Sequence, residues 1–380
     1  MNKDKIWLSS PHMGGNEQEF VQQAFDSNWV TTMGPNVDGF EQDLENYLGN
    51  NSFVAALNSG TSAIHLGLIL LEVQAGDEVI CQSFTFSASA NPILYQGATP
   101  IFVDSEPETW NICPIALENA ISDRIEKGRK PKAIIIVHLY GMPCKMDEIQ
   151  KIANTYQIPI LEDSAEALGS TYKGQKCGTF GTIAVFSFNG NKIITTSGGG
   201  ALICKSKNQK DKTIFLATQA RDNASHYQHS KLGFNYRMSN VCAGIGRGQM
   251  LVLDNHIEKR RANHKYYVDN LAEISDISFL SEPYESFSNR WLSCIIINPD
   301  NKKGISKEML RQALEKENIE SRPLWKPLHL QPIFRNYPYY GTNVSEKLFE
   351  NGLCLPSSSN LTFHDLERVV TAIKNIFLED

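Results

Sequence analysis

The chain has 380 residues, of which 41% are hydrophobic and 21% charged, and its formal net charge is -6. This length allows a large core and favours two domains over one. The negative charge argues against a broad basic surface, so we expect no nucleic-acid partner. No stretch is apolar for long enough to predict a signal peptide or a membrane span, and we therefore expect a cytoplasmic protein.

The eight cysteines predict a reducing compartment and no metal site. They include no CxxC pair, and none is spaced with histidines in a pattern typical of zinc. Free thiols are normal in the cytosol, where disulfides are rare.

Short apolar runs alternate with helical patterns through the first half of the chain. The runs include DEVICQSFTF (77–86), TPIFVDSE (99–106), KAIIIVHLYG (132–141) and IPILEDSAE (158–166), and two of the helical patterns are 61–73 and 146–156. Strands and helices in alternation predict an α/β domain with a mostly parallel sheet covered by helices.

This alternation weakens after Phe215. A polar segment then leads into a helical pattern that starts near Asn240, and a strand at 295–300 and helices at 307–319 and 363–377 follow. We therefore predict a large domain over residues 1–253 and a small C-terminal α+β domain over residues 254–380.

Three local patterns could carry chemistry. In NSGTSAIHLGL (58–68), small polar residues precede an apolar helix, and a helix start with free N–H groups can bind phosphate, although an ordinary N-cap is commoner. Asp163 ends a strand, at the edge where α/β sheets bind ligands, and could hold a cationic ring nitrogen; a solvated loop acid is the commoner alternative. In TIAVFSFNGNK (182–192), a strand ends close to Lys192, whose neutral amine could form a Schiff base, with Ser187 nearby to donate to a phosphate.

These parts together are what pyridoxal phosphate requires. GTSA, EDSAEALGS, GTFG and SFNGNKIITTSGGG, in this order, resemble the DegT/DnrJ/EryC1/StrS family of sugar aminotransferases. The resemblance extends over nearly the whole chain through SSPHMGGNE, NWVTTMGPNVDGFE, QSFTFSASANPI, GFNYRMSN and RPLWKPLHLQP. It implies fold type I, with a mixed, mostly parallel seven-stranded sheet in the large domain.

The resemblance also implies roles for individual residues. Lys192 and Asp163 would be catalytic, the lysine as the cofactor's anchor and the acid as the partner of its ring nitrogen. The remaining cofactor contacts would come from Gly60, Thr61, Phe86, Glu166, Ser187 and Asn235. The last of these would reach the phosphate in the neighbouring subunit, which implies a homodimer with shared active sites, and Arg237 would steady its loop or bind a substrate carboxylate.

Substrate binding is expected from a cluster of cationic and aromatic groups. Cations can pair with a pyrophosphate, and a planar ring can stack on a base. The candidates are Glu166, Arg322, Trp325, Lys326 and His329, and the alternative for the last four is a solvated proline-rich loop. Glu166 stands where many relatives have histidine. His138 ends another strand and could line the cleft, although a structural histidine is commoner.

The implied reaction is transamination from L-glutamate to the 4-keto carbon of a nucleotide-linked 6-deoxy sugar. SSPHMGGNE and RPLWKPLHLQP most resemble enzymes that aminate UDP-2-acetamido-4-keto sugars on the bacillosamine route for glycan biosynthesis. A GDP-perosamine synthase and a non-catalytic sugar-nucleotide binding protein are the alternatives. A dehydratase of this fold would carry histidine in place of Lys192, and a cysteine desulfurase would need a reactive loop thiol.

Overall fold

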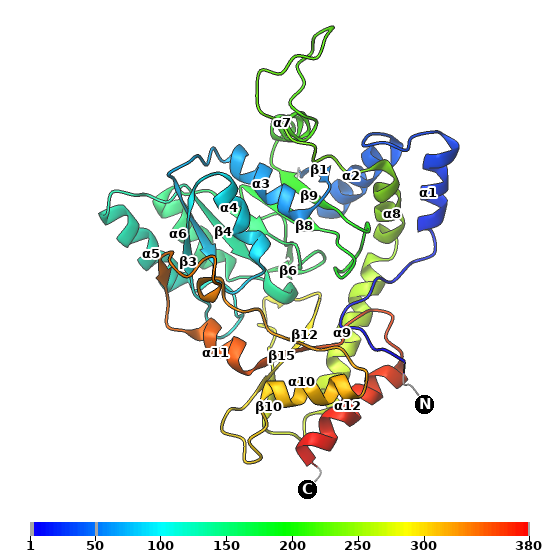
Figure 1. Cartoon of the computed structure of the whole chain (residues 1–380), viewed down its shortest axis with the longest axis vertical. Coiled ribbons are helices and arrows are strands. Elements are labelled where there is room, and N and C mark those ends of the chain that lie inside the picture. Colours follow the sequence, from blue (N-terminus) through cyan, green and yellow to red (C-terminus); the bar gives the residue numbers. More distant parts are fainter. Residues whose placement is uncertain (1–3, 50–51, 379–380) are drawn as a thin grey trace.

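The structure, a computed structural model, describes residues 4–49 and 52–378. Its central sheet has the strand order β1-β9-β8-β5-β4-β2-β3-β14 (Figure 1). Every strand of this sheet except β9 runs in the same direction. The strands are β1 (Phe53–Leu57), β2 (Glu78–Gln82), β3 (Thr99–Val103), β4 (Ala133–Val137), β5 (Ile160–Asp163), β8 (Ile183–Ser187), β9 (Gly200–Cys204) and β14 (Tyr339–Tyr340). The predicted α/β fold is confirmed.

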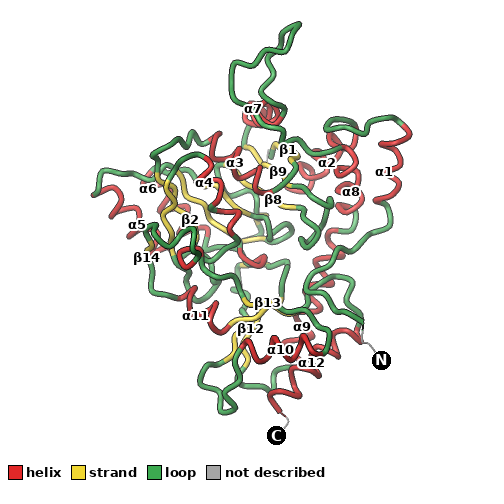
Figure 2. Tube along the Cα trace, in the orientation of Figure 1, coloured by secondary structure: helices red, strands yellow, loops and turns green. Residues whose placement is uncertain are grey.

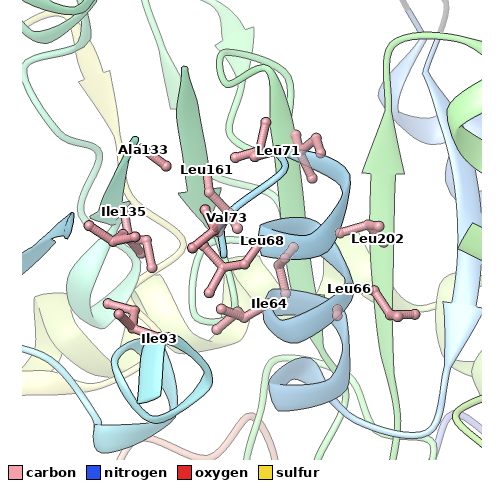
Figure 3. Close-up of a cluster of buried hydrophobic side chains, with 14 of the residues drawn as sticks. Ile64, Leu66, Leu68, Leu71, Val73, Ile93, Ala133, Ile135, Leu161 and Leu202 are labelled. Carbon is pink, nitrogen blue, oxygen red and sulfur yellow. The ribbon is translucent and has the colours of Figure 1, made fainter. Parts of the chain in front are cut away.

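Helices cover both faces of the sheet, as its buried apolar strands require (Figure 2). One face packs against α3 (Gly60–Leu70), α4 (Asn91–Tyr95) and α7 (Lys207–Ala217). The other packs against α2 (Pro35–Leu48), α5 (Pro114–Glu126), α6 (Met146–Tyr156) and α8 (Asn240–Met250), with α1 (Glu17–Asp26) outside α8. Successive residues of a strand face opposite layers. Figure 3 shows Ile64 and Leu68 of α3 near Leu161 and Leu202 of the sheet.

The C-terminal part has a core of its own. Its four-stranded sheet has the order β10-β12-β15-β13, with β10 (Ile277–Phe279), β12 (Ser293–Ile297), β13 (Arg322–Pro323) and β15 (Gly352–Leu355). The helices of this part are α9 (Leu253–Asn270), α10 (Lys307–Lys316), α11 (Val344–Asn351) and α12 (Phe363–Leu378). A third, small sheet is formed by β11 (Ser286–Phe287), β6 (Thr171–Tyr172) and β7 (Gln175–Lys176), and the 3-10 turns are η1 (Ser87–Ser89), η2 (Leu139–Gly141) and η3 (Leu328–Leu330).

Two segments cross between these parts. Ile6 is buried in the C-terminal core and forms a bridge with Ile319, although it belongs to the N-terminal segment. In the opposite direction, β14 pairs with β3, which makes the large sheet eight-stranded rather than seven-stranded. The predicted boundary after residue 253 coincides with the start of α9 and stays a prediction.

The glycines of α8 allow two helices to approach it closely. A Cβ on Gly248 would lie 2.7 Å from the backbone of Glu17 in α1, and one on Gly246 would lie 2.8 Å from the ring of Phe40 in α2. Close packing therefore offsets the weak helix propensity of glycine here. None of the described helices combines the length and apolar character that crossing a membrane would require.

Candidate active site

A cavity of about 240 Å³ lies at the edge of the sheet where β5 and β8 end and β9 begins. This is the edge at which open α/β sheets bind ligands. Its walls include Ser59, Gly60, Thr61, Thr85, Phe86, Ser89, Asp163, Glu166, Ser187, Asn189, Asn191, Lys192, Gly199, Trp291 and Trp325. The structure thus brings together residues from both parts of the chain.

Lys192 extends its ammonium into the cavity between an acid and an aromatic ring. Its Nζ lies 3.4 Å from Oε1 of Glu166 and 4.1 Å from the centroid of the Trp291 ring. The main chain around the lysine is held by Asn191, whose carbonyl accepts hydrogen bonds from the Trp291 indole (2.7 Å) and the Ser9 hydroxyl (2.6 Å). The side chain is therefore positioned, yet open to the cavity.

Asp163 is buried at the end of β5 and lines the same cavity. Burial raises the pKa of this carboxyl, because a charge is poorly solvated there. Two donors oppose the shift: the Ser89 hydroxyl bonds Oδ2 at 2.7 Å, and the Ala165 N–H bonds Oδ1 at 3.1 Å. The carboxylate is oriented and lacks a fully compensating cation, which suits a site for a cationic ring nitrogen.

The start of α3 forms one end of the cavity. Ser59 is the N-cap, and its Oγ accepts the N–H of Ser62. The first amides of a helix have no intrahelical acceptor, so those of Gly60 and Thr61 can bind an anion. Gly60 faces Ser187, and a Cβ on it would lie 3.0 Å from the serine Cβ. This cradle has the donors that a phosphate requires.

Aromatic rings line another part of the cavity. Phe86 is 54% exposed, and its ring centroid lies 5.6 Å from that of Trp325. Tyr140 stacks between Trp325 and Trp291, at 6.1 and 6.4 Å. Its hydroxyl also accepts the N–H of Trp325 at 2.9 Å. The wall can therefore face a planar ring or an apolar face of a sugar.

Glu166 is almost completely buried beside Lys192. Its Oε2 accepts the backbone N–H of Tyr140 at 2.7 Å, and Tyr140 holds a left-handed conformation with φ of 54°. Burial raises the pKa of Glu166, and the charge of Lys192 opposes this shift.

Three of the predicted substrate contacts do not line the cavity. Arg322 is exposed and pairs with Glu320 at 2.9 Å. His329 bonds Ser83 at 2.7 Å and stacks on Tyr339, and Lys326 is exposed. The structure does not place these three with Lys192, and their roles stay predictions. From that cluster only Trp325 reaches the cavity, together with Glu166.

Asn235 and Arg237 also lie outside it. The Asn235 side chain is exposed at the base of the segment that projects beyond α7 (Figure 1), where Thr218 and Asn235 form a bridge. Arg237 is buried, and its guanidinium donates to the Glu41 carboxylate and to the carbonyl of Ala56. Its position supports the predicted loop-steadying role rather than contact with a substrate in this cavity.

His138 is a buried structural histidine. Its Nδ1 accepts the N–H of Cys144 at 3.0 Å, so Nε2 carries the proton and donates to Glu162 at 2.9 Å. The ligand atoms of His138, Glu162 and Cys177 lie within 4.8 Å of one another, a grouping that their sequence spacing does not indicate. Each oxygen of Glu162 already accepts hydrogen bonds, from Ser164 and from amides of the 178–181 turn among others. These bonds explain the cluster as a structural anchor.

The residues missed by sequence reasoning include two that contact Asp163 and Lys192. Ser89 has a weak signal in SFTFSASA, a polar run after a strand, but nothing there identifies Asp163 as its partner. Trp291 has none, because it lies about 100 residues from Lys192 in the chain. Both contacts arise only when the chain folds.

Residues 11–374 match the DegT/DnrJ/EryC1/StrS aminotransferase family. The chain belongs to this family. This membership confirms the predictions of an aminotransferase and of pyridoxal phosphate as its cofactor.

Individual relatives span the whole chain. EpsN of Bacillus subtilis, named as a candidate pyridoxal phosphate-dependent aminotransferase, is 50% identical and covers 98% of this chain and 96% of its own. A GDP-perosamine synthase of Caulobacter vibrioides is 35% identical, with coverages of 98% and 99%. The PLP form of Spr1654 from Streptococcus pneumoniae, titled a candidate sugar aminotransferase, has a TM-score of 0.89 at 27% identity and 98% coverage of both chains.

Proposed function

We propose that this aminotransferase moves the amino group of L-glutamate to the C4 keto group of a nucleotide-linked 4-keto-6-deoxy sugar used in glycan biosynthesis. The observation that carries the proposal is the single cavity lined by Lys192, Asp163, Ser187 and the start of α3. It has a donor cradle for a phosphate, a carboxylate for a ring nitrogen and an amine for a carbonyl.

The proposed roles follow from these positions. When bound, pyridoxal phosphate supplies an aldehyde that links to amines and a ring that accepts electrons. Lys192 would anchor the cofactor, and its freed Nζ would take the proton from Cα of glutamate and later deliver a proton to C4 of the sugar. Asp163 would keep the ring nitrogen protonated, Ser187 and the amides of Gly60 and Thr61 would hold the phosphate, and Phe86 would contact the ring.

The sugar enters past the aromatic wall. Trp325 and Glu166 line the cavity beside Lys192 and are proposed to contact it. For the nucleotide, the N-terminal and 322–332 motifs resemble enzymes that act on UDP-2-acetamido-2,6-dideoxy-4-keto sugars. The GDP-perosamine synthases that are 35% identical over the whole chain support a GDP-linked substrate equally.

A homodimer with shared active sites completes the proposal. Asn235 is exposed at the base of a segment that projects from the body of the subunit, and Tyr227 and Leu232 of that segment are 79% and 81% exposed. A second group of exposed apolar side chains lies at the end of α1 and just after it: Phe25, Trp29, Val30 and Met33. Exposed apolar groups in such numbers are typical of an interface.

The test is a substrate comparison with the purified, cofactor-loaded protein. Borohydride reduction followed by peptide mapping should fix the cofactor on Lys192, and the Lys192→Ala variant should lose this product and roughly a thousandfold in rate. Lys205→Ala is the control, because Lys205 contacts the carbonyl of Thr179, outside the cavity. Amination of the UDP-linked or the GDP-linked 4-keto sugar by glutamate would identify the nucleotide; no amination of either would refute the proposed substrate class.

A further inference from the structure

In the proposed reaction Lys192 spends part of each cycle free of the cofactor, and its ammonium has two close neighbours in the fold. It is enclosed by Glu166 at 3.4 Å and by the face of Trp291 at 4.1 Å. We propose that Glu166 and Trp291 form a docking site for the protonated Nζ of Lys192, so that both are positioning residues that set how readily the free lysine gives up its proton. This inference rests on the proposed role of Lys192.

The first argument is electrostatic. Both side chains of the pair are withdrawn from water, with 13% of the Lys192 side chain and 5% of the Glu166 side chain exposed. An ion pair in such a place is screened far less than one on the surface. An opposite charge within about 4 Å favours the charged form of its partner.

The second argument is that Trp291 is fixed from three sides. Its indole N–H donates to the carbonyl of Asn191, and its own carbonyl accepts a 2.6 Å bond from Arg260 on α9. Tyr140 stacks near its ring. A tryptophan held in this way presents a preorganised π face, the best side chain for attracting an ammonium.

The third argument is that Glu166 is equally well oriented. Oε2 is occupied by the N–H of Tyr140, which leaves Oε1 for the lysine. The other charged or titratable groups around the pair are Asp163 on β5, Arg260 on α9, Tyr140 in η2 and Cys294 on β12. A neutral isostere at residue 166 would leave all of these in place.

The docking site explains why a glutamate is useful here. A lysine that has just left the cofactor would otherwise carry its charge in a cavity with an apolar wall, where solvation is poor. Docking stabilises this charged form, and Nζ stays beside the reacting atoms instead of turning towards bulk water.

The experiment measures the proton affinity of Lys192 directly in the cofactor-free protein. Acetic anhydride acylates only neutral amines, and peptide mass spectrometry gives the labelling rate of Lys192 across a series from neutral to alkaline pH. Glu166→Gln should lower the labelling midpoint and raise the rate below it by about tenfold, because the ammonium loses its partner charge. Trp291→Leu should raise the rate about two- to fivefold, whereas Trp291→Phe, which keeps a π face, should stay close to the wild type.

Two controls separate docking from a structural effect. Glu108→Gln removes the nearer of two acidic partners of Lys145, at 2.7 Å, and leaves Glu106 at 3.3 Å; it should change the labelling of Lys145 alone. Thermal unfolding of each variant checks that it folds. An unchanged or higher midpoint in folded Glu166→Gln would overturn the docking site. Borohydride trapping tests the proposed function separately. If the cofactor is trapped on Lys192 in the wild-type enzyme and the labelling midpoint of Glu166→Gln is unchanged, the docking site is refuted and the proposed role of Lys192 is not.

Discussion

Asp163 places its carboxylate in a buried site where the groups that bond it are neutral donors, although the charge of Lys192 acts on it from across the cavity. Its donors are a hydroxyl and one amide, and burial outweighs them, so its pKa is raised. A cationic ring nitrogen would supply the missing charge. Burial therefore disfavours the ionised form of Asp163 in the cofactor-free protein, and a cation bound beside the carboxylate would stabilise that form.

The raised pKa predicts how the stability of the cofactor-free protein depends on pH. When the pKa of a carboxyl is higher in the folded than in the unfolded state, the group stabilises the fold at pH values below its unfolded-state pKa, about 4. This stability is lost as the pH rises through the folded-state pKa. An asparagine at this position cannot ionise, so the Asp163→Asn variant does not lose this stability. Its free energy of unfolding should therefore rise relative to that of the wild type as the pH increases from about 4 to neutrality. Thermal unfolding over a pH series measures the difference.

Asp104 is a control of opposite sign. It is buried as well, and burial alone would raise its pKa, but the Ser345 hydroxyl and amides of the 342–345 turn lower it overall. Asp104→Asn should therefore be most destabilising near neutrality, and its effect should shrink as pH falls through the lowered pKa. The interpretation of Asp163 would be contradicted if both variants followed the same trend.

Four of the residues predicted for the cofactor follow or end strands or start a helix. Parallel strands bring their carboxyl ends to one edge, so Lys192, Asp163, Ser187 and Gly60 had to lie close together once the fold was known. Trp291 could not be found in this way, because its position depends on packing between the two parts of the chain. Arg322 and His329 are near Trp325 in sequence, but local backbone direction and the partners Glu320 and Glu346 keep them outside the cavity.

At the scale of elements, the alternation of strands and helices predicted most of the large sheet. The exceptions are β1 and β9, which none of the predicted apolar runs covers, and β14. The two residues of β14, Tyr339 and Tyr340, are too few for a periodic pattern and pair only because the chain returns to β3. The glycines of α8 illustrate a second limit. Propensity disfavours a helix there, and only contact with α1 and α2 explains it.

These contacts predict the effect of alanine in α8. Gly248→Ala would place a Cβ 2.7 Å from the backbone of Glu17, so α1 must shift, and we expect a loss of about 1–3 kcal/mol in the free energy of unfolding despite the better helix propensity. In the matched control, Gly39→Ala in α2, the Cβ meets the end of the Arg247 side chain, which can move. Denaturant unfolding of both should show Gly39→Ala near neutral or stabilising. Equal losses would mean that close packing is not what α8 requires.

At the scale of the whole molecule, the large sheet and the C-terminal part pack against each other beside the active site. The cluster around Phe84, Tyr140 and Trp291 also includes Cys294 and Leu324, so the aromatic wall belongs to the packing between the sheet and the C-terminal part. Residues 219–234 are different, because they project from the body of the subunit (Figure 1), tied at their base by the pairing of Gln219 with Phe234. The exposed side chains of this segment are the reason for the proposed contact with a second subunit.

Shared active sites predict complementation between two inactive variants. Lys192→Ala lacks the anchoring amine, and Asn235→Ala lacks the proposed contact to the partner's phosphate site, so each homodimer should be weak or inactive. A mixed dimer contains one site with both residues intact. After unfolding and refolding together in equal amounts, the pair should recover about a quarter of wild-type activity, since half of the dimers are mixed and half of their sites are complete.

The control for this experiment is a pair whose defects fall in one site. A mixture of Lys192→Ala and Asp163→Asn could regain activity only if the two residues of one site came from different subunits. The structure places both in one cavity of one chain. That mixture should therefore stay inactive. If the Asn235 pair stays inactive too, while light scattering shows a dimer, then Asn235 acts within its own subunit; a monomer by light scattering would remove the shared site altogether.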